Sequence, residues 1–361
     1  MKTHLERLLA SMKEKGVEAV LVTSEINQQY LTGFDFTDGY VLVTTEKSYL
    51  ITDFRYIEAA RAQADPAFEL LMPEEGMLKR ISALLGEHGV SRVLIEEETL
   101  ACLMRDKIQN AFGEGVKVAS GASALIDELR LYKDEKEIAA MQRAQDVADA
   151  AFMHILSWMK PEMTEIEVAL ELEFFMRRNG ARSTSFDTIA VSGTASSRPH
   201  GVPRPVKLEH GFFTMDFGAR VDGYCSDMTR TVVLGRADAE MKRLYGTVLR
   251  AQLTALEAAH AGAGCRALDK IARDIIDEAG YVGLFGHSLG HGVGMYIHEN
   301  PRLSKAAPED WVLKPGHVVT FEPGIYIEGK YGCRIEDFGV VLEDGSFRNF
   351  AHSPKQLIEL F

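Results

Sequence analysis

The segment DFGARVDGYCSDMTRT, residues 216–231, decides the fold of the second half of the chain. A largely apolar run at 212–215 leads into it, the dipeptide Asp222-Gly223 supplies a tight turn, and the β-branched residues 231–233 form a return strand. The pattern predicts a β-hairpin.

This hairpin carries one aspartate on each strand, Asp216 and Asp227. A loop at 221–222 would place them directly opposite each other, whereas a loop at 222–223 would pair Asp216 with Thr229 and leave Asp227 one diagonal away. Either register puts both carboxylates on one face. Neighbouring carboxylates raise each other's pKa unless a cation neutralises them, so we interpret the pair as part of a metal site. The alternative is turn chemistry on a solvated face.

A second stretch, GHSLGHGVGMYIHENP at 286–301, contains His287, His291 and His298. Its four glycines exclude a stable helix, so His287 and His291 are not the helical histidine pair of a zinc peptidase. A glycine-rich loop allows close backbone approach and can hold imidazoles at the edge of a site. Any one of these histidines could instead be a hydrogen-bonded core residue.

Two glutamates stand in otherwise apolar segments, Glu322 in VVTFEPGIYI (318–327) and Glu336 in CRIEDFGVV (333–341). We expect both to be buried, which is costly unless each is paired or bound to a cation. A buried salt bridge is the alternative for either one alone. Their even separation lets both face the same side of a second hairpin.

Four carboxylates and one imidazole would make an oxygen-rich site with room for two divalent ions. Such a ligand set suits manganese, with cobalt, zinc or iron as alternatives. Two such ions would activate a bridging water and polarise a carbonyl, which is hydrolytic chemistry.

The length and charge of the chain narrow the class of protein. At 361 residues we expect two domains. A formal net charge of -13 disfavours nucleic acid or an anionic membrane as a partner. Four scattered cysteines without a C-x-x-C pair predict reduced thiols. The charged N-terminus lacks a signal-peptide pattern and no apolar run is long enough for a membrane span, so we expect a cytoplasmic protein.

Strand and helix signals alternate in the first part of the chain, which predicts an α/β domain. A rise in charge density near 126–136 marks the boundary, so we expect domains at 1–124 and 125–361. The second domain reads as α+β with antiparallel sheet, and a capping box predicts a helix over 165–179 within it. All the candidate chemistry lies there.

With ligands in the order Asp, Asp, His, Glu, Glu, the chain resembles the metal-dependent Xaa-Pro peptidases. These are the prolidase and aminopeptidase P group of peptidase family M24, related to methionine aminopeptidase and creatinase. The resemblance covers essentially the whole length and implies a creatinase-like α/β N-terminal domain followed by an α+β pita-bread catalytic domain. It also implies hydrolysis, by a metal-bridging water, of the bond between an N-terminal residue and proline in small peptides, and a homodimer.

Carried over to this sequence, the resemblance implies that Asp216 binds one ion, that His291 and Glu322 bind the other, and that Asp227 and Glu336 bridge them.

The resemblance also implies roles for residues around the metal. Glu322 would take the proton of the bridging water, His200 in SSRPH would reach the substrate, and His298 in HENP would stabilise the tetrahedral intermediate. Thr229 would support the metal carboxylates. The positions expected to contact or support the substrate are His287, Arg302, Tyr326 and Arg334.

Three questions stay open from the sequence. The proline carboxylate of a dipeptide would need a cation such as Arg302 or Arg334, whereas an aminopeptidase would leave room for a longer chain. A creatinase-like hydrolase would use the same fold without metal, which the complete ligand set argues against. A catalytically silent pita-bread binding module is the third reading, and the presence of His200 and His298 argues against it.

Overall fold

The structure, a computed structural model, describes residues 2–361. It divides into two compact units, the first ending at Arg130 and the second running from Leu131 to Phe361. The boundary expected after residue 124 falls inside helix α6 (Ala122–Arg130). This helix packs on α1, β1 and β5, so the first unit extends to its last residue.

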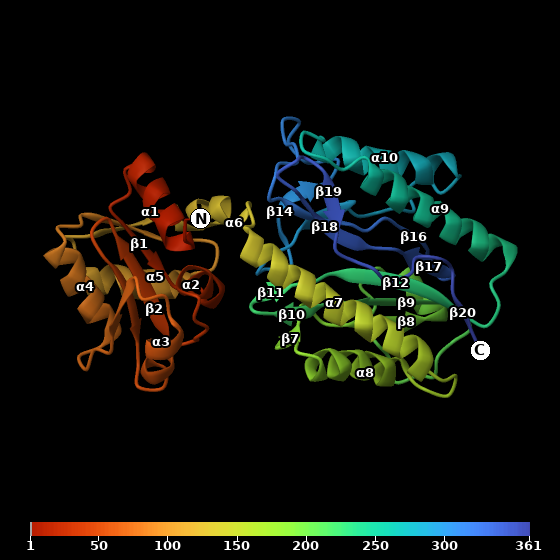
Figure 1. The fold of residues 1–361 in the computed structure, drawn as a ribbon, viewed down its shortest axis with the longest axis horizontal. Helices are drawn as coiled ribbons and strands as arrows, with labels where there is room; N and C mark the ends of the chain where they lie inside the picture. The colour runs from red at the N-terminus through yellow and green to blue at the C-terminus, as the bar shows by residue number, and fades with distance from the viewer. Residues whose placement is uncertain (1) are drawn as a thin grey trace. The chain divides into compact units, whose positions relative to one another are not determined.

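The first unit is a mixed six-stranded sheet with helices packed against it (Figure 1). Its strand order is β4-β3-β2-β1-β5-β6; the β1–β2 and β2–β3 pairs are antiparallel and the other three pairs are parallel. The elements are α1 (His4–Lys15), β1 (Ala19–Val22), α2 (Glu25–Thr32), β2 (Gly39–Thr44), β3 (Ser48–Thr52), α3 (Ile57–Gln63), β4 (Phe68–Leu71), α4 (Met77–Glu87), β5 (Arg92–Ile95), α5 (Cys102–Phe112), β6 (Lys117–Ser120) and α6.

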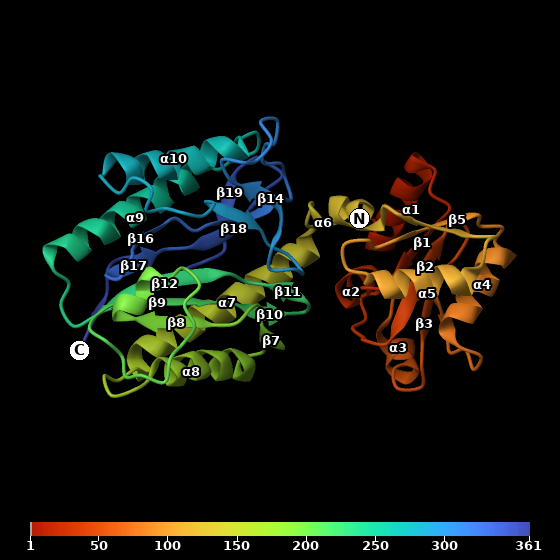
Figure 2. The same ribbon diagram turned by 180° about the vertical axis from the view of Figure 1, so that it is seen from behind.

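The second unit places sheets between two pairs of helices, with α7 and α8 on one side and α9 and α10 on the other (Figures 1 and 2). The helix expected over 165–179 is observed as α8, and it begins with the predicted capping box. The helices are α7 (Glu135–Trp158), α8 (Glu165–Arg178), η1 (Gly193–Ser197), α9 (Ala239–Glu257) and α10 (Cys265–Glu278).

Four sheets make up the strand layers of this unit, with orders β20-β12-β9-β8, β14-β13-β15-β18-β19, β11-β10-β7 and β16-β17. The strands are β7 (Ser183–Thr184), β8 (Ile189–Ser192), β9 (Gly211–Phe217), β10 (Ala219–Val221), β11 (Tyr224–Cys225), β12 (Met228–Leu234), β13 (Gly290–Gly292), β14 (Glu299–Leu303), β15 (Val318–Phe321), β16 (Gly324–Ile327), β17 (Tyr331–Arg334), β18 (Asp337–Val341), β19 (Phe347–Asn349) and β20 (Glu359–Leu360).

The first hairpin adopts the register with a loop at 222–223. Asp222 and Gly223 have φ angles of 51° and 87°, the left-handed conformations that a tight two-residue hairpin turn requires. Val221 therefore pairs with Tyr224, and further along the ladder Asp216 lies opposite Thr229.

The second hairpin places the two glutamates opposite each other. Phe321 pairs with Asp337 in the β15–β18 ladder, and Gly324 pairs with Arg334 in the β16–β17 ladder. The same register, continued between the two ladders, sets Glu322 against Glu336.

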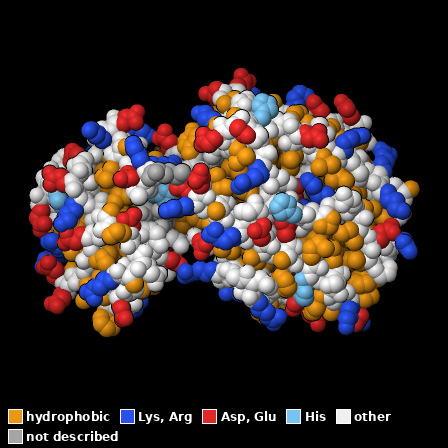
Figure 3. Space-filling model, in the orientation of Figure 1, with side chains coloured by type: hydrophobic (Ala, Val, Ile, Leu, Met, Phe, Trp, Pro, Cys, Tyr) orange, Lys and Arg blue, Asp and Glu red, His pale blue; other side chains and the backbone are white. Residues whose placement is uncertain are grey.

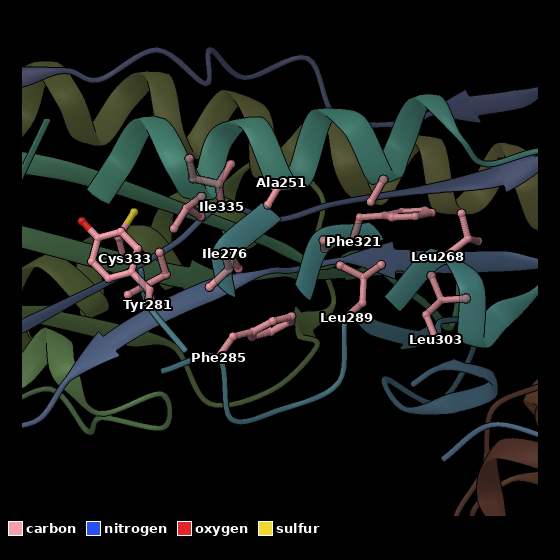
Figure 4. Packing of buried hydrophobic residues seen from close by; sticks show 14 of the residues in the cluster. Ala251, Leu268, Ile276, Tyr281, Phe285, Leu289, Leu303, Phe321, Cys333 and Ile335 are labelled. Atoms are coloured by element: carbon pink, nitrogen blue, oxygen red, sulfur yellow. The ribbon is translucent and has the colours of Figure 1, made fainter. Parts of the chain in front are cut away.

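An apolar core beneath α9 and α10 holds this second hairpin in place (Figure 4). Phe321, Leu268 and Leu289 are buried in it, with at most 1% of each side chain exposed. Because side chains alternate along an extended chain, burial of Phe321 on the helix side turns Glu322 to the opposite side.

The face of the protein in Figure 3 carries acidic and basic side chains interspersed with apolar ones. Within residues 2–361, the structure contains no helix that combines the length and the apolar character needed to cross a membrane.

A buried arginine joins the two hairpins. Arg230 on β12 is 1% exposed, and its guanidinium donates to the Oδ1 atom of Asp337 at 2.7 Å. It also donates to the backbone carbonyl oxygens of Glu336 at 2.6 Å and Ser353 at 3.0 Å. Arg230 thus fixes the start of β18 and the residue directly before it, Glu336.

We expect Arg230→Met to lower the free energy of unfolding of the second unit by about 3–5 kcal/mol, because it removes one partner of a buried ion pair. Both tryptophans, Trp158 and Trp311, lie in this unit, so urea unfolding followed by tryptophan fluorescence measures the effect. The control is Arg250→Met on the exposed face of α9, which should change the value by less than about 0.5 kcal/mol. Equal losses in the two variants would contradict this role of Arg230.

Candidate metal centre

All five predicted ligands line one cavity of about 430 Å³ in the second unit. Two come from the first hairpin, two from the second, and one from the glycine-rich segment, where β13 replaces any helix. They are Asp216, Asp227, Glu322, Glu336 and His291.

Three of these residues form a tight group. Asp227, His291 and Glu336 are all buried, and each offers one ligand atom such that the three atoms lie within 4.8 Å of one another. This spacing suits donors that share an ion.

The ionised forms of the carboxyl groups are disfavoured by burial and by mutual repulsion. Burial raises the pKa of Asp227 and Glu336 well above the ordinary values, and the charges of the neighbouring carboxylates raise both further. Burial also raises the pKa of Glu322 to about 8, although the charge of Arg334 opposes this shift. A divalent cation would offset both the cost of ionising a buried carboxyl group and the repulsion between neighbouring carboxylates, because it stabilises the ionised form of every carboxylate that it contacts.

His291 presents one ring nitrogen to the carboxylates. Its Nδ1 atom lies 3.0 Å from the carbonyl oxygen of Gly292, which can only accept, so Nδ1 carries the proton and Nε2 keeps its lone pair. Nε2 lies 3.4 Å from Glu322 and 3.6 Å from Asp227. Burial lowers the pKa of His291 to about 3, so the ring is neutral and these contacts are not ion pairs. Neutral imidazole is the form that binds metal.

Asp216 differs from the other carboxylates because the protein supplies a cation for it. Its Oδ2 atom accepts a hydrogen bond from Nη2 of Arg334 at 2.6 Å. Its Oδ1 atom is buried and accepts no hydrogen bond from any residue in the range 2–361. An unpartnered buried carboxylate oxygen, beside carboxyls with raised pKa and a neutral imidazole, fits a site for divalent metal ions.

Arg334 and Thr229 connect the two hairpins behind the ligands. The Nε atom of Arg334 donates to Oγ1 of Thr229 at 3.0 Å, and the hydroxyl of Thr229 donates to Glu336 at 2.6 Å. Thr229 thus hydrogen-bonds to Glu336, one of the predicted metal ligands.

Tyr326 is not among the residues that line the cavity. Its hydroxyl oxygen accepts from Nη1 of Arg334 at 2.8 Å and lies 3.0 Å from Nε2 of His287. Because Nδ1 of His287 donates to the carbonyl of Ser288 at 2.9 Å, Nε2 accepts the proton of the tyrosine. Tyr326 thus orients two residues that do line the cavity.

The remaining predicted residues, His200, His298 and Arg302, all line the cavity. The ring of His298 meets that of His291 edge to face, with centroids 4.4 Å apart. Burial lowers the pKa of His298, and the charge of Arg302 lowers it further. The guanidinium of Arg302 forms no hydrogen bond or ion pair with any other residue that the structure describes, in contrast to Arg334.

Sequence reasoning missed a second wall of the cavity. Phe186, Asp187 and Ile189 lie on it, just before and at the start of β8, and so does Ile297 beside His298. A charged residue directly before an apolar strand, as in FDTIAV, was the signal available in the sequence.

Comparisons with known proteins identify related sequences and similar structures. Residues 139–343 match the family described as "Metallopeptidase family M24", and residues 4–132 match the family described as "Creatinase/Prolidase N-terminal domain". An uncharacterized peptidase of Bacillus subtilis is 41% identical over 359 residues, which is 99% of each chain.

Two solved structures are similar over nearly the whole chain. An Xaa-Pro dipeptidase from Bacillus anthracis is 42% identical, with a TM-score of 0.92 and coverage of 99% of both chains. An X-Pro aminopeptidase from Thermotoga maritima is 34% identical, with a TM-score of 0.90 and coverage of 97% of this chain and 100% of that one. The predicted fold class, a creatinase-like α/β domain followed by an α+β pita-bread domain, is confirmed.

The raised pKa of Glu322 predicts how pH affects stability. A carboxyl whose pKa rises on folding stabilises the protein fully below its ordinary pKa of 4.5, and this contribution is lost as pH rises through the folded value of about 8. Ions bind the deprotonated ligands, so the stabilisation that added manganese gives should grow across the same pH window. Melting temperatures of metal-stripped protein, with and without manganese, measure this difference. A difference that stays constant from pH 4.5 to 8 would refute the expectation.

Proposed function

The chain belongs to metallopeptidase family M24, and from this premise we propose that it hydrolyses the bond between an N-terminal residue and proline in dipeptides. The observation that carries the proposal is the cavity in which four carboxylates and one neutral imidazole meet. We propose that Asp216 binds one divalent ion, that His291 and Glu322 bind the other, and that Asp227 and Glu336 bridge them. When bound, such ions supply an activated water and polarise the scissile carbonyl.

The side chains around the ligands supply the proton transfers. Glu322 faces the cavity opposite Glu336, and we propose that its carboxylate takes the proton of the attacking water and delivers it to the leaving proline nitrogen. His298, in contact with His291, would donate to the oxygen that becomes negative in the tetrahedral intermediate. His200, on the loop between η1 and β9, would contact the substrate.

The different surroundings of two arginines favour a dipeptide as the substrate. Arg334 is committed to Asp216, Thr229 and Tyr326, so its charge already has a partner inside the protein. Arg302 lines the same cavity, where its charge acts on Glu322, but it forms no hydrogen bond or ion pair among residues 2–361. A free proline carboxylate would give Arg302 a counterion, with the paired oxygens that a guanidinium binds best.

We propose manganese as the metal because the ligand set is rich in carboxylate oxygens, although cobalt and zinc accept the same ligands. We also propose that the enzyme acts in the cytoplasm, as its four unpaired cysteines suggest, and that it forms the homodimer implied by the family resemblance.

The experiment that tests this function compares Ala-Pro with Ala-Pro-Ala, using manganese-loaded and metal-stripped protein. We expect hydrolysis of Ala-Pro only when metal is present, and slow hydrolysis of the tripeptide. Comparable cleavage of both peptides would indicate an aminopeptidase. Cleavage of neither by the loaded protein would overturn the function and leave a binding module as the better account.

Arg302→Met sharpens this test. We expect it to lower kcat/KM for Ala-Pro by about 10- to 100-fold, the value of one charge-assisted hydrogen bond, and to change hydrolysis of the amide Ala-Pro-NH₂ much less. Arg250→Met on the surface of α9 is the control for loss of one positive charge. An equal loss on Ala-Pro and Ala-Pro-NH₂ would remove Arg302 from carboxylate recognition.

The bridging roles predict metal content. Asp227→Ala or Glu336→Ala should reduce bound manganese from two ions per chain to nearly none, because each variant removes a ligand shared by both positions. Elemental analysis after gel filtration measures the content. Asp310→Ala, at an exposed position outside the cavity, should keep two ions. Two tightly bound ions in either ligand variant would rule out the bridging assignment.

A further inference from the structure

The wall of the cavity formed by residues 186–189 carries an acidic group that the proposed hydrolysis does not use. Phe186, Asp187 and Ile189 line the cavity, whereas Thr188 between them is buried, with 5% of its surface exposed. Asp187 and Ile189 therefore face the same cavity.

The register of β8 places this wall beside one metal ligand. Ile189 pairs with Asp216 in the β8–β9 ladder, and Asp187 is two residues further along, a span of at most about 7 Å. Asp216 is not in the close group formed by Asp227, His291 and Glu336.

The opposite charge lies elsewhere in the cavity. Arg302 belongs to β14, in the segment that follows His298, whose ring contacts His291. A dipeptide with its carboxylate at Arg302 and its scissile bond at the predicted ligands would leave the part of the cavity beside Asp216, lined by Ile189 and Asp187, for its first residue.

Asp187 has the properties of a group that binds a ligand. It is exposed, and within residues 2–361 no hydrogen bond or ion pair engages its carboxylate. Its neighbours Phe186 and Ile189 give the wall an apolar surface up to the carboxylate. Lysine and arginine side chains match such a wall, since their stems are apolar and their tips are charged.

We propose that Asp187 selects substrates whose first residue is cationic, so that Arg-Pro and Lys-Pro are preferred over neutral dipeptides of the same size. The inference rests on the proposed Xaa-Pro hydrolysis. The stem of the first residue packs on Phe186 and Ile189, and its charge pairs with Asp187 at the rim.

The test compares Arg-Pro with citrulline-Pro, which has nearly the same shape and no charge, using the full-length manganese-loaded enzyme. We expect kcat/KM to favour Arg-Pro by about two- to fivefold at low salt, the range for an exposed ion pair, and the preference to shrink as salt is added. Asp187→Asn should bring the ratio to about one, and Asp187→Lys should reverse it and favour Glu-Pro over Gln-Pro. The matched control is Asp310→Asn, which should keep the ratio of the unmodified enzyme.

Two results would overturn the inference, and they differ in what else they affect. If Asp187→Asn keeps the kcat/KM ratio of Arg-Pro to citrulline-Pro, Asp187 has no selective role, and the Xaa-Pro hydrolysis still stands. If, in addition, this variant hydrolyses both peptides more slowly by the same factor, Asp187 binds the α-ammonium group that all substrates share. Failure of the unmodified enzyme to cleave any Xaa-Pro dipeptide overturns the hydrolysis together with its selectivity.

Discussion

Mutual repulsion among buried carboxylates is the constraint on which the second unit depends. Burial disfavours the ionised forms of Asp227, Glu322 and Glu336, and the charge of Asp216 raises the pKa of all three further. Arg334 is the cation that hydrogen-bonds to a member of this group, Asp216, and its charge only partly offsets the raised pKa values of the other three. The rest of the charge is left for bound metal. The four carboxylates are Asp216, Asp227, Glu322 and Glu336.

The apolar core and the turns decide where these carboxylates point. In the first hairpin the left-handed conformations of Asp222 and Gly223 set the register that brings Thr229 opposite Asp216. In the second hairpin, Phe321 enters the core under α9 and α10, so the next residue must face the cavity. A site that is costly by itself is therefore held by elements that are stable for other reasons.

The sequence predicted what depends on local pattern and failed where a distant partner decides. Both hairpins and α8 follow from turn residues, alternation and capping, but the choice between two registers of the first hairpin needed the backbone conformation. Helix α2 was not predicted, because it buries the polar residues Asn27 and Gln28. Asn27 donates to Glu96 at 2.7 Å across 69 positions of sequence, a contact that no periodicity reveals. The sequence likewise could not show that Arg334 is hydrogen-bonded within the protein whereas Arg302 is not, because the partners of Arg334 include residues far away in the sequence.

Two adjacent residues show that burial by itself does not make a metal site. Asp337 is as buried as Glu336, and burial acts to raise its pKa, yet the charges of Arg230 and Lys355 lower that pKa overall. It is an ionised carboxylate with protein cations around it, since Lys355 lies 2.6 Å away and Arg230 lies 2.7 Å away. Glu336, directly before the first residue of β18, is buried and meets the charges of Glu322 and Asp216 instead, so its pKa moves upward. The adjacent residues Asp337 and Glu336 are therefore equally buried but differ in role: protein cations pair with Asp337, whereas Glu336 is available to a metal ion. The surrounding charges, rather than the depth of burial, determine this difference.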